Sequence, residues 1–160
     1  LDSPLTERGQ EQARRQAELL AALPPMAAWA SPAGRAVATA RIALAGRPFR
    51  QDWRLVEIDL GPQNGATLAD LRQAHPQAFT AGGIGWYDRL PGAEGFAALR
   101  ARVAAFLAEL DQPAVIVTHG ITLHMIRLVA MDLPLAALGR LPVVQGALHH
   151  VHQGRHQVIS

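Results

Sequence analysis

The sequence contains no cysteine and no lysine, and its only tyrosine is Tyr87. The absence of cysteine excludes a disulfide framework, a thiol nucleophile and a cysteine-ligated zinc site. The absence of lysine excludes a Walker A phosphate-binding loop. The three serines, Ser3, Ser31 and Ser160, lie outside any G-x-S-x-G elbow, which excludes that type of serine hydrolase. No apolar run reaches the roughly 18 residues that a membrane span needs, so no membrane partner is expected.

Positive charge is present but scattered along the chain. All 15 basic residues are arginine, against 13 acidic residues, so the formal net charge at pH 7 is +2. Arg14 and Arg15 are the only adjacent pair, whereas a nucleic-acid-binding protein usually gathers its basic residues into one patch. The composition therefore argues against a nucleic-acid partner. The expected compartment is the cytoplasm.

The length suits one domain. With 160 residues, 49% of them hydrophobic, the chain can bury a single core. It opens on Leu1 rather than on methionine, in what reads as the loop before a helix. We therefore expect residues 1–160 to form one domain that is incomplete at its N-terminus.

Hydrophobic periodicity and turn residues divide the chain into alternating helices and strands. Four helices are expected, at residues 6–23, 34–44, 95–110 and 121–130. A smaller helical excursion is expected over residues 67–85, where Thr67 is a capping residue and Pro76 a helix breaker. Strands are expected at residues 26–30, 49–59, 114–118, 143–144, 148–151 and 157–159. The continuous β-branched run at 114–118 is typical of a central strand buried on both faces.

Strands that alternate with helices predict an α/β fold, a three-layer α/β/α sandwich with a mostly parallel sheet. In such sheets the functional groups gather beyond the carboxyl ends of the strands. Two segments end there. The strand at 26–30 leads into Ser31 and Arg35, and the strand at 114–118 leads into His119 and Gly120.

His119 and Arg35 suit an anion site. His119 precedes a helix N-terminus, which favours negative charge, and Gly120 beside it allows a ligand to approach the backbone. The guanidinium of Arg35, at the start of another helix, can bind two phosphate oxygens at once. The alternatives are a structural histidine and a solvated arginine in the first turn of a helix.

Two carboxylates are candidates for proton transfer. Glu57 lies in an apolar, strand-like stretch, where it is either an outward-facing residue or an acid whose pKa is raised by burial. Glu94 precedes the most regular helix and can be explained as a carboxylate favoured by the helix dipole.

The C-terminal histidines raise the question of a metal. In a strand only His150 and His152 share a face, and His156 lies across a turn. Because no cysteine, aspartate or glutamate accompanies them, we expect surface or edge-strand histidines, no metal site and no cofactor. His75 and His124 fit structural roles.

Five segments, in order, resemble the histidine phosphatase superfamily, which has the phosphoglycerate mutase-like fold. They are residues 4–9 (PLTERG), 31–40 (SPAGRAVATA), 55–61 (LVEIDLG), 94–96 (EGF) and 118–120 (THG). The second resembles the family signature S-P-x-x-R-A-x-x-T-A, and the last resembles the segment that carries the second family histidine. The resemblance spans nearly the whole chain.

The resemblance implies a role for each residue. Arg35 would bind phosphate together with the backbone at Gly120, His119 would stabilise the transferring phosphoryl group, and Glu57 would protonate the leaving oxygen. The reaction would be metal-free phosphomonoester hydrolysis of a small phosphorylated metabolite, through a phosphohistidine. The alternatives are an α-ribazole phosphatase, a phosphoglycerate mutase-like activity or a protein-phosphohistidine phosphatase. A homodimer is compatible with this interpretation.

One family motif is missing. The nucleophile of the family is a histidine in an R-H-G motif on an N-terminal strand, and the sequence has no R-H-G. We expect that strand to precede Leu1. If it does not, the chain is a catalytically silent module that keeps the phosphate pocket.

Overall fold

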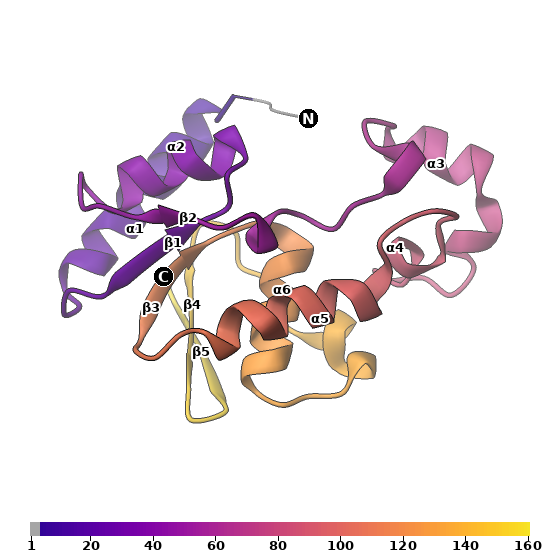
Figure 1. The fold of residues 1–160 in the computed structure, drawn as a ribbon. Helices are drawn as coiled ribbons and strands as arrows, with labels where there is room; N and C mark the ends of the chain where they lie inside the picture. The colour runs from indigo at the N-terminus through magenta and orange to yellow at the C-terminus, as the bar shows by residue number, and fades with distance from the viewer. Residues whose placement is uncertain (1–3) are drawn as a thin grey trace.

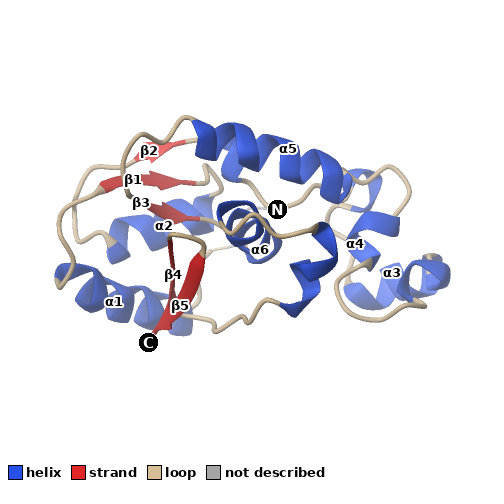
Figure 2. Ribbon diagram, turned by 90° about the horizontal axis from the view of Figure 1, so that it is seen from below, coloured by secondary structure: helices blue, strands red, loops and turns tan. Residues whose placement is uncertain are grey.

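A computed structural model describes residues 4–160, so the expected loop at Leu1, Asp2 and Ser3 lies outside the described residues. A parallel sheet lies between two layers of helices, with a two-stranded hairpin and a small helical lobe at its sides (Figures 1 and 2). This arrangement confirms the predicted α/β sandwich.

The sheet has β1 (Ala27–Ala30) at its centre. β1 pairs in parallel with β2 (Arg50–Gln51) on one side and with β3 (Ala114–Val117) on the other, with Trp29 opposite Ile116. Because successive side chains of a strand face opposite sides, Trp29 and its two alanine neighbours contact different helices. Each face of the sheet therefore has its own core.

Two helices, α1 (Glu7–Ala21) and α2 (Gly34–Ala43), cover one face. α1 starts where the sequence predicts, because the Thr6 hydroxyl accepts a hydrogen bond from the Gly9 backbone N–H at 3.1 Å. The small side chains on this face let α2 approach the strands closely. The buried core here consists of Leu20, Ala28, Ala30, Ala40, Ala43 and Leu44.

Two more apolar helices, α5 (Gly95–Ala108) and α6 (Gly120–Ala130), cover the opposite face. The Trp29 ring meets the Phe106 ring edge-on, with centroids 5.5 Å apart. The helix predicted over 95–110 is confirmed, and its buried residues are Phe96, Leu99, Val103 and Phe106. Among residues 4–160 no helix is long and apolar enough to span a membrane.

A helical lobe lies between β2 and α5 along the chain and to one side of the sheet (Figure 1). α3 (Leu68–Ala74) begins with a capping box between Thr67 and Asp70 and ends before Pro76, as the sequence predicts, and a 3-10 helix at Pro76–Phe79 follows. α4 (Trp86–Arg89) completes the lobe. The small core of the lobe consists of Leu71, Ala78 and Leu90.

The strand predicted over residues 49–59 is wrong beyond Gln51. The carboxylate of Asp52 accepts a hydrogen bond from the Arg54 N–H at 2.8 Å and starts a 3-10 helix, Trp53–Leu55. Among the described residues, no strand pairs with residues 56–60. Glu57 therefore lies in an irregular segment, because the carbonyl groups here bond to side chains instead of to a strand.

Of the other strand predictions, the one at 114–118 is confirmed as β3 and the one at 143–144 is wrong. Within residues 4–160 β3 pairs with β1 alone and its side chains are half-buried, so its predicted central place in the sheet stays a prediction. Val143 and Val144 form no strand and are 53% and 44% exposed. Their β-branched side chains favour a strand, but Pro142 before them has no N–H to donate, and its carbonyl accepts from Arg127 instead of from a neighbouring strand.

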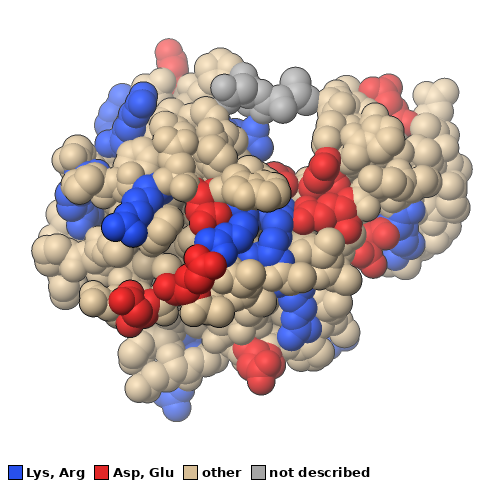
Figure 3. Space-filling view, in the orientation of Figure 1, with Lys and Arg blue, Asp and Glu red and all other residues tan. Residues whose placement is uncertain are grey.

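Opposite charges are paired at the surface. The guanidinium of Arg54 lies 2.7 Å from carboxylate oxygens of both Asp52 and Glu109. On the face shown in Figure 3, basic and acidic side chains are interspersed. The expectation that the chain has no nucleic-acid partner agrees with this distribution and stays a prediction.

The predicted C-terminal hairpin is confirmed. β4 (Leu148–His152) and β5 (Arg155–Ile159) pair antiparallel. The turn between them consists of Gln153 and Gly154, with positive φ angles of 49° and 71°. Two consecutive residues with positive φ are typical of the tight turn that matches the twist of a hairpin.

A buried arginine joins the hairpin to α6. Arg127 is 1% exposed, and its Nη1 donates to the Pro142 carbonyl and lies 3.2 Å from His149 Nδ1 and 3.5 Å from His156 Nε2. The imidazole nitrogens of His149 and His156 are themselves 3.0 Å apart. Burial lowers the pKa of both histidines, and the charge of Arg127 lowers it further. Both rings are therefore neutral at pH 7, and because these two nitrogens lie within hydrogen-bonding distance of each other, one of them donates and the other accepts.

The linkage of these two histidines to stability has a definite sign. Each pKa is lower in the folded chain than the value of about 6.5 in the unfolded chain, so the unfolded chain binds more protons. We expect the free energy of unfolding, measured by urea denaturation, to decrease as the pH falls below about 6.5. A chain with His149→Asn and His156→Gln should lose less stability over the same pH range. An equal loss in both chains would contradict this assignment.

Candidate active site

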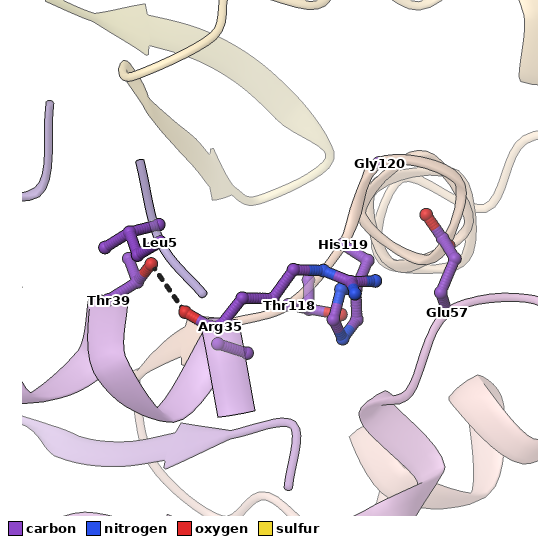
Figure 4. A pocket seen from close by; sticks show the side chains of 8 residues that line it. Leu5, Arg35, Thr39, Glu57, Thr118, His119 and Gly120 are labelled. Atoms are coloured by element: carbon purple, nitrogen blue, oxygen red, sulfur yellow. Dashed lines mark hydrogen bonds between the residues drawn. The ribbon is translucent and has the colours of Figure 1, made fainter. Parts of the chain in front are cut away.

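A pocket of about 220 Å³ lies where the carboxyl ends of β1 and β3 meet the N-termini of α2 and α6 (Figure 4). It contains all four residues that the sequence puts forward as site residues. Its lining consists of Leu5, Arg35, Ala36, Thr39, Glu57, Thr118, His119 and Gly120.

Arg35 comes from the first turn of α2. The chain reaches it through a loop that prolongs the sheet, because the Ser31 N–H donates to the Val117 carbonyl at 2.9 Å. The side chain of Arg35 is directed toward His119 in the pocket (Figure 4). The alternative of a fully solvated arginine does not fit this half-buried position.

His119 lies between β3 and α6 and is 8% exposed. Burial lowers its pKa; the negative charge of Glu57 opposes this shift, and the positive charges of Arg35 and Arg102 add to it. The imidazole is therefore neutral at pH 7. A neutral ring has one N–H donor and one acceptor nitrogen.

Ser31 is a site residue that the sequence interpretation did not assign. Its hydroxyl oxygen lies 2.8 Å from Nε2 of His119 and accepts a hydrogen bond from the Ala33 N–H at 3.3 Å. The side chain is fully buried. Its position directly after β1, at the edge of the sheet where His119 follows β3, was the available signal. Ser31 fixes one nitrogen of the histidine ring.

The carboxylate of Glu57 lies at the N-terminus of α6. Oε1 accepts from the Thr122 N–H at 3.0 Å, and Oε2 accepts from the Ile121 N–H at 3.2 Å. Amides in the first turn of a helix have no partner inside the helix, so a carboxylate satisfies them well. The helix that begins at His119 therefore also positions Glu57.

Gly120 separates the two functional side chains. A Cβ atom at this position would lie 3.6 Å from Oε2 of Glu57. Because glycine has no side chain, one side of the Glu57 carboxylate stays uncovered. Gly120 itself lines the pocket. The phosphate contact expected at this backbone stays a prediction.

Glu94 does not line the pocket. Its carboxylate forms an ion pair with Arg102, and both side chains are 14% exposed. The interpretation of Glu94 as a simple helix-start carboxylate misses this pair. Sequence reasoning had no signal for it, because the two residues are eight positions apart and their contact depends on how the chain enters α5.

The expectation that the C-terminal histidines hold no metal stays a prediction. Within the part of the chain that the structure describes, no three His, Asp or Glu side chains converge as ligands. The guanidinium of Arg127 also lies close to both His149 and His156, where a shared cation would have to bind. His124 has a structural contact, with Nδ1 3.1 Å from the Leu138 carbonyl oxygen.

Comparison with known proteins identifies the family. Residues 1–159 match the histidine phosphatase superfamily (branch 1). The adenosylcobalamin/alpha-ribazole phosphatase of Salmonella typhimurium is 32% identical over 152 residues, which cover 90% of this chain and 75% of that protein.

Solved structures show the same relationship. The alpha-ribazole phosphatase of Shigella flexneri superposes with a TM-score of 0.78 at 26% identity, over 98% of this chain and 84% of that chain. A mycobacterial glucosyl-3-phosphoglycerate phosphatase superposes with a TM-score of 0.77 at 30% identity, over 89% of this chain and 74% of that chain. The chain therefore belongs to branch 1 of the histidine phosphatase superfamily, as its motifs predict.

Binding of inorganic phosphate or vanadate tests the pocket directly. We expect Arg35→Ala to weaken binding by about tenfold or more, because a hydrogen-bonded charge pair is worth roughly 1.5–3 kcal/mol. Isothermal titration calorimetry gives the Kd. The matched control is Arg41→Ala, which removes an exposed arginine from the same helix and should leave the Kd unchanged. Equal affinities in the two variants would exclude Arg35 from the site.

Proposed function

We propose that the protein is a metal-free phosphomonoesterase that acts on a small phosphorylated metabolite through a phosphohistidine. The observation that carries the proposal is the meeting of Arg35, His119 and Glu57 in one pocket at two helix N-termini. These groups supply a cation, a neutral imidazole and a carboxylate. Phosphoryl transfer requires positioning, compensation of negative charge and a proton for the leaving group.

Arg35 and His119 form the phosphate end of the proposed site. The guanidinium of Arg35 would bind two phosphoryl oxygens, and His119 would donate a hydrogen bond to a third. Because Ser31 Oγ lies 2.8 Å from Nε2 of His119, Nδ1 is the nitrogen left to reach the ligand. The dipoles of α2 and α6 favour the same negative charge.

Glu57 would transfer the proton. In the first step the nucleophilic imidazole attacks phosphorus, the bond between phosphorus and the ester oxygen breaks, and Glu57 gives its proton to the departing alcohol. In the second step water attacks the phosphohistidine, Glu57 takes a proton from that water, and inorganic phosphate leaves the restored histidine. The same carboxyl group thus serves as acid and then as base.

The nucleophile is the remaining part of the proposal. We assign it to an R-H-G segment that precedes residue 1 and pairs with the outer edge of β3. Within residues 4–160 that edge has no strand partner, and the carboxyl end of a parallel strand placed there would reach the pocket. The intact mass of the natural protein, with peptide sequencing, tests this assignment against the 17.2 kDa of residues 1–160.

The proposed substrate is a small phosphate ester. The names of the Salmonella and Shigella relatives make an α-ribazole phosphate the first compound to assay. A catalytically silent phosphate-binding module is the second candidate function, and a natural gene product without R-H-G upstream of Leu1 would favour it. Phosphate binding without turnover by the natural gene product would support this second candidate.

Turnover measurements test the roles in the reaction. We expect hydrolysis by the natural gene product to survive EDTA, because no step uses a metal. Glu57→Gln keeps the shape of the side chain but cannot transfer a proton, so kcat should fall by about 10²–10⁴-fold while the Kd for phosphate changes little. Loss of activity in EDTA that zinc restores, or full activity of Glu57→Gln, would contradict the proposal.

A further inference from the structure

We propose that Arg102 and Glu94 are positioning residues that hold the carboxylate of Glu57 at the pocket. The inference rests on the proposed function for its meaning in catalysis, but the positioning itself can be measured without turnover. Neither residue lines the pocket, so neither is assigned a direct contact with substrate.

Arg102 takes the place of a neighbouring strand beside the segment that carries Glu57. Residues 56–60 have no strand partner among the described residues, yet their backbone still needs hydrogen bonds. The side chain of Arg102 supplies them. Its Nη1 donates to the Arg54 carbonyl and, at 3.0 Å, to the Val56 carbonyl, and its Nη2 lies 3.3 Å from the Glu57 carbonyl oxygen.

Glu94 holds the other end of the same segment. Its backbone N–H donates to the Asp59 carbonyl at 2.8 Å, and its Oε2 accepts from the Asp59 N–H at 3.1 Å. The same carboxylate receives Nε and Nη2 of Arg102 in a bidentate pair. Contacts on both sides of Glu57 are therefore linked through one ion pair.

Two threonine hydroxyls hold the opposite side of the segment. The Thr118 hydroxyl donates to the Leu55 carbonyl at 2.7 Å, and the Thr122 hydroxyl donates to the Val56 carbonyl at 2.7 Å. The segment is thus held between α5, through Arg102, and the start of α6. With both sides fixed, the Glu57 side chain can reach the first amides of α6.

The geometry requires arginine. The hydrogen bonds of Arg102 engage its five N–H donors, two on the carboxylate of Glu94 and three on backbone carbonyls of residues 54–57. Lysine keeps the charge but has three donors on one nitrogen and cannot reproduce a planar fork. Arg102→Lys therefore separates positioning from charge.

Amide hydrogen exchange of the natural gene product, followed by NMR, is the primary test. The N–H groups of Ile121 and Thr122 are in the first turn of α6 and owe their protection to Glu57. In Arg102→Lys we expect both to exchange about tenfold faster or more. The amide of Met125, fully buried in the same helix, should change much less. Arg100→Lys, two positions away on α5, is the matched control.

The outcomes are distinct. A selective increase at Ile121 and Thr122 supports the proposal, whereas no increase, or an equal increase across α6, overturns it. If Arg102→Lys fails to fold, Glu94→Gln weakens the same ion pair and should give a smaller change of the same selectivity. None of these readouts depends on activity, so failure of the proposed function leaves this test intact.

Leaving-group dependence extends the test to the active gene product. An ester with a good leaving group, such as p-nitrophenyl phosphate, departs without a proton, whereas an alkyl phosphate needs one. Arg102→Lys should therefore lower kcat much more for an alkyl phosphate, leave KM nearly unchanged, and add little to Glu57→Gln in the double variant. Equal losses with both esters would indicate a structural role only.

Discussion

The contact between the Glu57 carboxylate and the first amides of α6 is the interaction on which the rest of the site depends. It satisfies two N–H groups that a helix cannot satisfy by itself, at 3.0 and 3.2 Å. It also joins the segment that carries Glu57 to the start of α6, two parts of the chain that no strand pairing connects within the described residues. His119 begins the helix and Glu57 caps it, so the relative position of an imidazole and a carboxylate is set by backbone hydrogen bonds.

The charge of the pocket depends both on which ionisable side chains line it and on how burial shifts their pKa values. Arg35 supplies one cation, and two helix N-termini add partial positive charge. Glu57 supplies one negative charge. His119 stays neutral because burial lowers its pKa and the charges of Arg35 and Arg102 reinforce this, although Glu57 opposes it. A neutral imidazole can bind an anion by hydrogen bonding without placing a second full positive charge beside Arg35.

The sequence predicts those parts of the fold that local chemistry determines. Thr6 and Thr67 mark helix starts because a hydroxyl caps the helix within three residues, and the apolar spacing over 95–110 locates α5. Arg35 and His119 can be found because each lies at the start of a helix that follows a strand of the sheet. The same reasoning fails for residues 52–60, where an apolar run is held by Arg102 and two threonines instead of by a neighbouring strand.

The way Arg102, Thr118 and Thr122 hold the Glu57 segment has an evolutionary consequence. Apart from the ion pair with Glu94, these side chains bond to carbonyl oxygens, which every amino acid possesses. Substitutions at Val56 or Ile58 would therefore leave those hydrogen bonds available, within the limits of packing. A lineage could alter the shape of the pocket near Glu57 without moving the carboxylate. Such a separation allows substrate preference to diverge on a constant chemical framework.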